Sequence, residues 1–259
     1  MKIPSENNVL LIAHRGSSHE RPENTPAAFE AALVQGVAGI ETDIQMSKDG
    51  VPVLFHDRNL SRITGIKKKI AELPLKELKE LDVGSWFHPS FHGERILTLD
   101  EFLDRFGERT FLCLEIKARI GDDPERSRSL AEKTVEAVVR RKLVERSAII
   151  SFNQAVLETV LEKRSGVRTG LITEKKLPLP FSPFILREDL SALCFYVKIL
   201  SGPLAKAAQG AGKQIYAYPC DAPEEVDHAL ACGADGIISN KPGWLSSYLR
   251  LNHKAVSSL

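Results

Sequence analysis

The chain has 259 residues, of which 43% are hydrophobic and 27% are charged, and this length suits one large domain or two small ones. Its 35 basic and 34 acidic residues give a net charge of +1, so nothing indicates the basic excess or stripe that marks nucleic-acid-binding proteins. The sequence contains no run of about 18 apolar residues, and its four cysteines form no CxxC pair. Residues 1–8 are a short polar stretch, so we expect no signal peptide. We therefore expect a cytoplasmic protein with reduced thiols, without a transmembrane segment or a nucleic-acid partner.

Short apolar runs alternate with helical patterns along most of the chain. Helices are predicted over residues 26–35, 99–106, 124–142, 154–164, 184–189, 202–210, 223–232 and 244–251. Strands are predicted over residues 9–13, 39–46, 51–55, 110–116, 148–151, 167–172, 193–197, 214–218 and 236–239. The Asp49-Gly50 turn between the second and third strands predicts a hairpin there.

The stretch from residue 58 to residue 96 breaks this rhythm, with a lysine run, a short helix near residues 73–81 and the Trp86-Phe87 pair. We interpret it as an insertion in a strand-to-helix connection whose aromatic residues pack the insertion itself. The whole pattern predicts a single-domain (β/α)8 TIM barrel over residues 1–259, with a small insertion at about 58–96, after the second-strand region. A doubly wound open sheet is the alternative, but the polar residues at the ends of several strands favour the barrel.

Carboxylates gather at the ends of two predicted strands. Glu41 and Asp43 are two residues apart, so they point to one face of their strand, and Glu115 and Lys117 share a face of another. Three carboxylates at one barrel mouth would repel one another unless a cation lay among them. Oxygen ligands without a His/Cys cluster favour Mg²⁺ or Ca²⁺ over zinc. The alternative is a set of unrelated charges that pair with neighbouring helices.

Two histidines also follow apolar strands, His14 and His56. A pair of imidazoles beside an acidic site indicates a general acid and a general base, and Arg15 can bind a phosphate with two hydrogen bonds. Lys117 either neutralises the carboxylates or binds a phosphate oxygen. Asp57 either orients His56 or caps the next segment, and we favour the capping role.

The loop after the first strand carries three further polar residues. Asn24 or Thr25 is expected to cap the helix that follows. Glu23 either belongs to this cap or turns back to bind Arg15 or a substrate hydroxyl.

Tyr218, at the end of a late strand, is expected to line the mouth of the barrel.

The order of these motifs resembles the glycerophosphodiester phosphodiesterases over nearly the whole chain. The matching runs are His14-Arg15-Gly16, Pro22-Glu23-Asn24-Thr25, Glu41-Thr42-Asp43, Lys48-Asp49-Gly50, Val53-Leu54-Phe55-His56-Asp57, Thr98-Leu99, Glu115-Ile116-Lys117, Ser151-Phe152 and Asp235-Gly236-Ile237-Ile238-Ser239. The resemblance implies a (β/α)8 barrel hydrolase of glycerol and lipid metabolism that cleaves small-molecule glycerophosphodiesters to glycerol 3-phosphate and an alcohol. It implies one divalent cation, Mg²⁺ or Ca²⁺, held by Glu41, Asp43 and Glu115, an acid–base pair in His14 and His56, phosphate contacts from Arg15 and Lys117, and neighbouring substrate contacts from Glu23 and Asn24.

Two runs depart from the family's usual pattern. A Trp-Thr-x-Asn run is usual after the seventh strand, and here the residues are Tyr218-Pro219-Cys220-Asp221. The run Ser239-Asn240-Lys241-Pro242 replaces a more usual Thr-Asp-x-Pro. We expect the Tyr218 region to contact the alcohol or glycerol moiety, which leaves the preferred alcohol open.

Three other functions stay open at this point. The nearest is the same chemistry on lysophospholipids, as a lysophospholipase D. The second is a non-catalytic binding protein on the same barrel, and the third is an acid–base barrel enzyme that acts on sugars through its carboxylates. The paired histidines and Arg15 favour the phosphodiesterase over the sugar enzyme.

Overall fold

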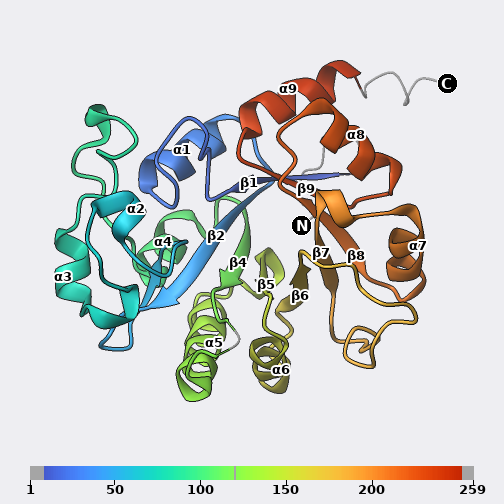
Figure 1. The fold of residues 1–259 in the computed structure, drawn as a ribbon, viewed down its shortest axis with the longest axis horizontal. Helices are drawn as coiled ribbons and strands as arrows, with labels where there is room; N and C mark the ends of the chain where they lie inside the picture. Colours follow the sequence, from blue (N-terminus) through green and yellow to red (C-terminus); the bar gives the residue numbers. More distant parts are fainter. Residues whose placement is uncertain (1–8, 120, 253–259) are drawn as a thin grey trace.

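In the computed structural model, which describes residues 9–119 and 121–252, eight parallel strands close into a barrel (Figure 1). Strand β1 (Leu10–His14) pairs with β2 (Gly39–Met46) on one side and with β9 (Gly236–Ser239) on the other, and these two pairings close the ring. Between β9 and β2 the order is β8 (Gln214–Tyr218), β7 (Ala192–Tyr196), β6 (Arg168–Thr173), β5 (Ser147–Ser151) and β4 (Phe111–Ile116). The predicted barrel is confirmed, and the open-sheet alternative is wrong.

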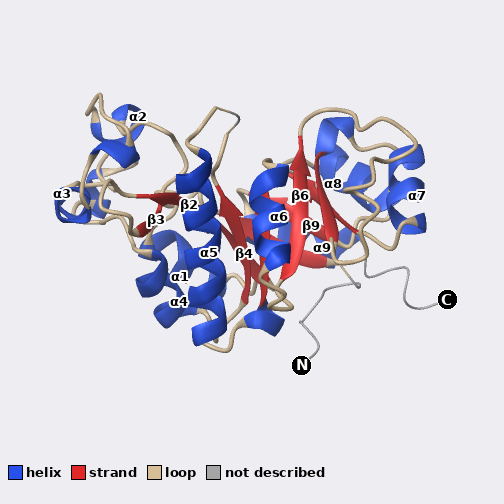
Figure 2. Cartoon of the chain, turned by 90° about the horizontal axis from the view of Figure 1, so that it is seen from below, coloured by secondary structure: helices blue, strands red, loops and turns tan. Residues whose placement is uncertain are grey.

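Helices alternate with the strands and lie around the barrel (Figures 1 and 2). They are α1 (Pro26–Val34), α4 (Leu99–Phe106), α5 (Pro124–Arg140), α6 (Gln154–Glu162), α7 (Gly202–Gly210), α8 (Pro223–Ala231) and α9 (Pro242–Asn252), with short 3-10 turns at Val144–Arg146 and Val197–Ile199. The prediction of a helix over residues 184–189 is wrong. That segment forms turns, because Phe184 and Ile185 are anchored in the core while Arg187 pairs locally with Asp189.

Alternating side chains along each strand separate the two layers of the core. On β4, Leu112 and Leu114 point outward and join the apolar cluster beneath α1, α4 and α5, whereas Cys113 points inward. Together with Cys113, the inward residues of the other strands fill the barrel with apolar side chains below its carboxyl-terminal mouth. These are Ile12, Cys113, Ile150, Ile172, Ala192, Cys194, Tyr216 and Ile238.

Three phenylalanines link α1 to α4. Phe29 lies 4.8 Å from Phe102 and 5.3 Å from Phe106, measured between ring centroids. All three rings are fully buried, and such tilted and edge-on pairs add to the stabilisation from burial. This cluster holds α1 and α4 together beside β1 and β2. These two strands carry much of the site described below.

The segment between β2 and α4 begins with β3 (Pro52–Leu54), which pairs antiparallel with β2 as the turn predicts. The chain then forms α2 (Ser61–Thr64), α3 (Leu75–Glu80) and 3-10 turns at Ile70–Glu72 and Pro89–Phe91. This insertion surrounds an apolar cluster of its own, which includes Leu60, Ile70 and Leu78, and it extends to one side of the barrel (Figure 1). Trp86 donates its indole N–H to the Val83 carbonyl at 2.8 Å, but its side chain is exposed and lies outside this cluster.

Candidate active site

Strand register brings the polar residues of three strands to one edge of the barrel. His14 on β1 lies opposite Glu41 on β2, and Asp43 on β2 lies opposite Glu115 on β4. Because parallel strands present their carboxyl ends at the same edge, side chains from distant parts of the chain converge there. Lys117 follows directly after β4 and reaches the same place.

The carboxylates of Glu41, Asp43 and Glu115 form a tight, buried cluster. One oxygen from each lies within 4.8 Å of the others, and all three residues are at least 93% buried. Burial and repulsion from the other two carboxylates raise the pKa of Glu41 well above its usual range. Among the described residues Glu41 Oε1 has no hydrogen-bond donor, so a buried acceptor atom of the cluster is left for a cation.

Two basic side chains compensate part of this negative charge. Arg15 Nε lies 3.2 Å from Asp43 Oδ2, and Lys117 Nζ lies 3.2 Å from Asp43 Oδ1 and 2.7 Å from Glu115 Oε1. Although burial acts to raise the pKa of Asp43, Lys117 and Arg15 hold it well below its usual range. Burial raises the pKa of Glu115 despite Lys117. When all three carboxylates are ionised, two cations face three anions and one negative charge is uncompensated.

The loop after β1 is shaped to support this cluster. Arg15 and Asn24 both adopt positive φ angles, of 57° each, and the amide N–H of Arg15 donates to Glu41 Oε2 at 3.1 Å. Asn24 is buried; its amide group donates to Asp43 Oδ2 at 2.8 Å and accepts the Thr42 hydroxyl at 2.7 Å. The helix cap is Thr25, whose hydroxyl accepts the Ala28 N–H, so Asn24 is free to hold a carboxylate.

His14 sits between the cluster and the neighbouring strand β9. Its Nδ1 is 2.7 Å from Asn240 Oδ1, and its Nε2 faces the carboxylates, 3.8 Å from Glu41 Oε2. Burial lowers the pKa of His14 to about 3, and Arg15 contributes in the same direction. The imidazole is therefore neutral near pH 7 in the absence of bound ligands.

His56 follows β3 and faces the site from the insertion side. The expected capping role of Asp57 is wrong: its Oδ1 is 2.8 Å from His56 Nδ1, and its Oδ2 accepts Arg62 Nε at 2.6 Å. Gln45 Nε2 donates to the carbonyls of Phe55 and Asp57 at 2.6 and 2.7 Å, which fixes the backbone around His56. Burial lowers the pKa of His56 as well.

Glu23 links the first loop to the insertion. Its Oε1 accepts Arg62 at 2.6 Å and lies 3.5 Å from an Arg15 nitrogen. Of the two roles open for Glu23, the structure thus places it against Arg15. Arg62 also lies over the Trp86 ring, 5.4 Å from the ring centre, so the insertion supports both His56 and the first loop.

A cavity of about 220 Å³ opens over these residues. Its two halves differ in character: the strands β1, β2 and β4 contribute charged groups, whereas β5 to β9 contribute mainly apolar and aromatic ones. The second half includes Tyr218, as expected, and Glu174 is its one carboxylate among the described lining residues. The lining residues are His14, Arg15, Glu41, His56, Glu115, Lys117, Ile150, Phe152, Ile172, Glu174, Cys194, Tyr196, Tyr218, Pro219 and Ile238.

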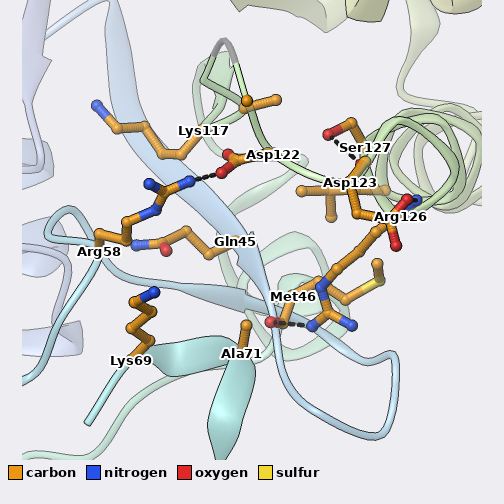
Figure 3. Close-up of a pocket in the computed structure, with 13 residues that line it drawn as sticks. Gln45, Met46, Arg58, Lys69, Ala71, Lys117, Asp122, Asp123, Arg126 and Ser127 are labelled. Carbon is orange, nitrogen blue, oxygen red and sulfur yellow. Dashed lines mark hydrogen bonds and ion pairs between the residues drawn. The ribbon is translucent and has the colours of Figure 1, made fainter.

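A second cavity, of about 310 Å³, lies between the insertion and the start of α5 (Figure 3). Lys117 borders both cavities, but the arginines of this one already have partners. Arg58 pairs with Asp122, and Arg126 donates to the Met46 carbonyl at 2.7 Å (Figure 3). The Arg58 contact joins the insertion to the barrel, the Arg126 contact joins α5 to β2, and the histidines belong to the first cavity.

The site contains residues that the sequence analysis did not select. Asn240 contacts His14 although 226 positions separate them, and Asp221 in turn holds Asn240. Their only signal in the sequence is that both lie in the two runs that depart from the family pattern. Arg62 has no such signal, because it lies in an irregular insertion.

Comparisons with known proteins agree on one family. Residues 14–244 match the model of the glycerophosphoryl diester phosphodiesterase family. A glycerophosphodiester phosphodiesterase of Caldanaerobacter subterraneus subsp. tengcongensis is 35% identical, over 93% of this chain and 98% of the relative. A mouse lysophospholipase D, GDPD3, is 27% identical, over 93% of this chain and 82% of the relative.

A solved structure shares the fold at similar coverage. It is a phosphodiesterase of Oleispira antarctica in complex with its product sn-glycerol-3-phosphate, with a TM-score of 0.83 and 28% identity over 93% of this chain and 96% of that one. Among the described residues, no helix has the length and apolar character needed to cross a membrane. The chain belongs to the glycerophosphoryl diester phosphodiesterase family and is a phosphoric diester hydrolase.

Proposed function

We propose that the protein hydrolyses glycerophosphodiesters to glycerol 3-phosphate and an alcohol, with the help of one divalent cation and of His14 and His56 as acid and base. The observation that carries this proposal is the meeting of both imidazoles with the carboxylate cluster in one cavity. The match to a family of glycerophosphoryl diester phosphodiesterases, and the structural similarity to a phosphodiesterase in complex with its product sn-glycerol-3-phosphate, support the choice of substrate.

The three carboxylates fit a hard divalent cation. Glu41, Asp43 and Glu115 would hold it, since they offer only oxygen atoms and Glu41 Oε1 has no donor among the described residues. When bound, the cation would stabilise negative charge on the phosphoryl oxygens. The charge balance agrees, because a divalent cation and a singly charged phosphodiester together would neutralise the one uncompensated negative charge of the site. Mg²⁺ and Ca²⁺ are both suitable ions.

Arg15 and Lys117 are the groups proposed to bind the phosphate. Both border the cavity, and both now pair with Asp43 at 3.2 Å. Glu23 and Asn24 would keep Arg15 and Asp43 in place rather than contact the phosphate themselves. Tyr218, on the aromatic half of the cavity, would contact the glycerol or the leaving alcohol.

The two histidines would act in two successive steps. In the first, one imidazole takes the proton of the glycerol hydroxyl next to the ester, the hydroxyl oxygen attacks phosphorus, and the other imidazole protonates the departing alcohol. The product is a cyclic phosphate. In the second step, water attacks phosphorus with the proton-transfer roles reversed, and the ring P–O bond breaks to give glycerol 3-phosphate. The negative phosphodiester would raise the low pKa of one imidazole and so allow it to carry the acid's proton.

Lysophospholipids are a second substrate class with some support. The mouse relative is named a lysophospholipase D, and the half of the cavity formed by β5 to β9 contains Ile150, Phe152 and Ile172. An acyl chain would need such an apolar wall.

A cytoplasmic location stays a prediction.

The test is the release of glycerol 3-phosphate from glycerophosphocholine and glycerophosphoethanolamine, first in EDTA and then with Mg²⁺ or Ca²⁺ restored. We expect release only with a divalent ion, and a fall of turnover of about 100-fold or more in H14A and in H56A. H88A is the matched control, since His88 is exposed on the insertion and contacts Ser90. A folded H14A or H56A protein with near-normal turnover would overturn the acid–base assignment, and activity on lysophospholipids alone would favour the second class.

A further inference from the structure

The two runs that depart from the family pattern meet behind His14. Asp221 follows β8 and Asn240 follows β9, and these strands are neighbours in the barrel (Figure 1). Asn240 Nδ2 donates to Asp221 Oδ2 at 2.5 Å, and Asn240 Oδ1 lies 2.7 Å from His14 Nδ1. A hydrogen-bonded chain therefore runs from a carboxylate through an amide to an imidazole.

The donors and acceptors of these three side chains fix the direction of both hydrogen bonds. An ionised carboxylate only accepts hydrogen bonds, so Asp221 must face the NH₂ side of the Asn240 amide. The amide oxygen then points at His14, and because it too only accepts, His14 Nδ1 must carry the hydrogen. His14 Nε2 is left as the nitrogen that exchanges protons, and it is the one that faces the carboxylate cluster.

Asp221 is itself held in place. Its Oδ1 accepts the Ser239 hydroxyl and the Asn240 backbone N–H, both at 2.8 Å. Ser18 Oγ lies 2.7 Å from the His14 carbonyl and 3.0 Å from Asn240 Oδ1, and it can donate its one hydrogen to either oxygen. The orientation that directs the Asn240 NH₂ group at Asp221 and the amide oxygen at His14 satisfies both of these partners.

We propose that Asp221 and Asn240 are positioning residues that fix the Nδ1–H tautomer of His14 and direct its Nε2 at the substrate. The inference rests on the proton-transfer role of His14 proposed above. Hydrogen-bond partners of this kind orient the imidazoles of metal-binding histidines, where their loss lowers metal affinity or activity by about 10- to 100-fold.

The reciprocal exchange gives the test. D221N alone allows the Asn240 amide to turn, and N240D alone sets two carboxylates against each other, so we expect kcat to fall about 10-fold or more in each. KM should change little, because the proposed phosphate contacts are untouched. D221N/N240D restores an acceptor toward His14 and a donor behind it, so kcat should return to within a few-fold of the parent enzyme. A merely structural role predicts that the double variant is the worst of the three.

A spectroscopic readout is independent of turnover. In ¹⁵N-labelled protein, the nitrogen chemical shifts of His14, assigned by their loss in H14Q, should report the Nδ1–H tautomer in the parent and in D221N/N240D but not in D221N. The control is D235N, because Asp235 accepts the Ile215 N–H at 2.8 Å at the opposite end of the strands.

The outcomes separate the two proposals. An Nε2–H tautomer in the parent protein, or single variants with unchanged kcat and tautomer, would overturn the positioning role. A double variant no better than the single ones would do the same. Full activity in H14A would instead overturn the acid–base role, whatever the tautomer.

Discussion

Substitution of Glu41 by glutamine should separate metal binding from folding. The carboxylate oxygens of Glu41, Asp43 and Glu115 lie within 4.8 Å of one another, and two unit charges at about 4 Å repel by about 4 kcal/mol at an effective dielectric constant of about 20. E41Q removes the source of this repulsion, which together with burial raises the pKa of Glu41 in the metal-free protein, but it also removes one anionic ligand from the proposed site. We therefore expect metal affinity to fall about 100-fold, equivalent to about 2.7 kcal/mol, while the metal-free protein becomes no less stable.

The measurement is the free energy of unfolding with EDTA and with Mg²⁺ or Ca²⁺ at about 100 times the parent's dissociation constant. The parent should gain about 2.7 kcal/mol and E41Q only about 0.4 kcal/mol. E136Q changes an exposed glutamate of α5 and should respond like the parent. An E41Q protein that gains as much from the metal as the parent would refute the assignment of Glu41 as a ligand.

The pH dependence of the metal-free proteins gives a second check on Glu41. Burial raises the pKa of Glu41 in the folded protein, so its ionisation destabilises the fold once the pH exceeds the unfolded value of about 4.3. The stability advantage of E41Q over the parent should therefore be small near pH 4 and grow as the pH rises. An advantage that shrinks with rising pH would contradict this electrostatic account.

Three further predictions follow from particular contacts. F102A should lower the free energy of unfolding by about 3–5 kcal/mol in denaturant titration, since Phe102 is fully buried against Phe29; a loss below about 1 kcal/mol would mean that the cluster is not rigid. T98A should lower it by about 1 kcal/mol, because the Thr98 hydroxyl accepts the Glu101 N–H at 3.1 Å in a capping box, whereas T98S should be near neutral. Because burial lowers the pKa of His56, the acidic limb of kcat/KM should lie below the unperturbed value of about 6.5, and a limb above it would argue against His56 as the base.

The sequence predicts most of the secondary structure because the signals are local. The strand of residues 39–46 and the helix of residues 202–210 have the predicted bounds, since an alternating or helical spacing of apolar residues reports directly on which face is buried. The segment of residues 184–189 fails for the opposite reason: its few apolar residues are anchors of the distant core, and they do not form a helical stripe.

The same distinction applies to the site. Glu41 and Asp43 can be placed on one face from their spacing alone, because successive side chains of a strand point to opposite faces. The pairing of Asp57 with His56 could not be chosen over a capping role, since neighbouring residues allow both, and Arg62 decides between them by occupying the second carboxylate oxygen.

What only the tertiary structure decided is which distant groups meet. The sequence by itself determined the strands, most helices and the identity of the charged residues at the strand ends. It could not place Asn240 against His14, 226 positions away, because that contact exists only once β9 pairs with β1 and closes the barrel. Hydrogen bonds have short range and strict geometry, so partners that far apart in the chain are fixed by the packing of the whole barrel.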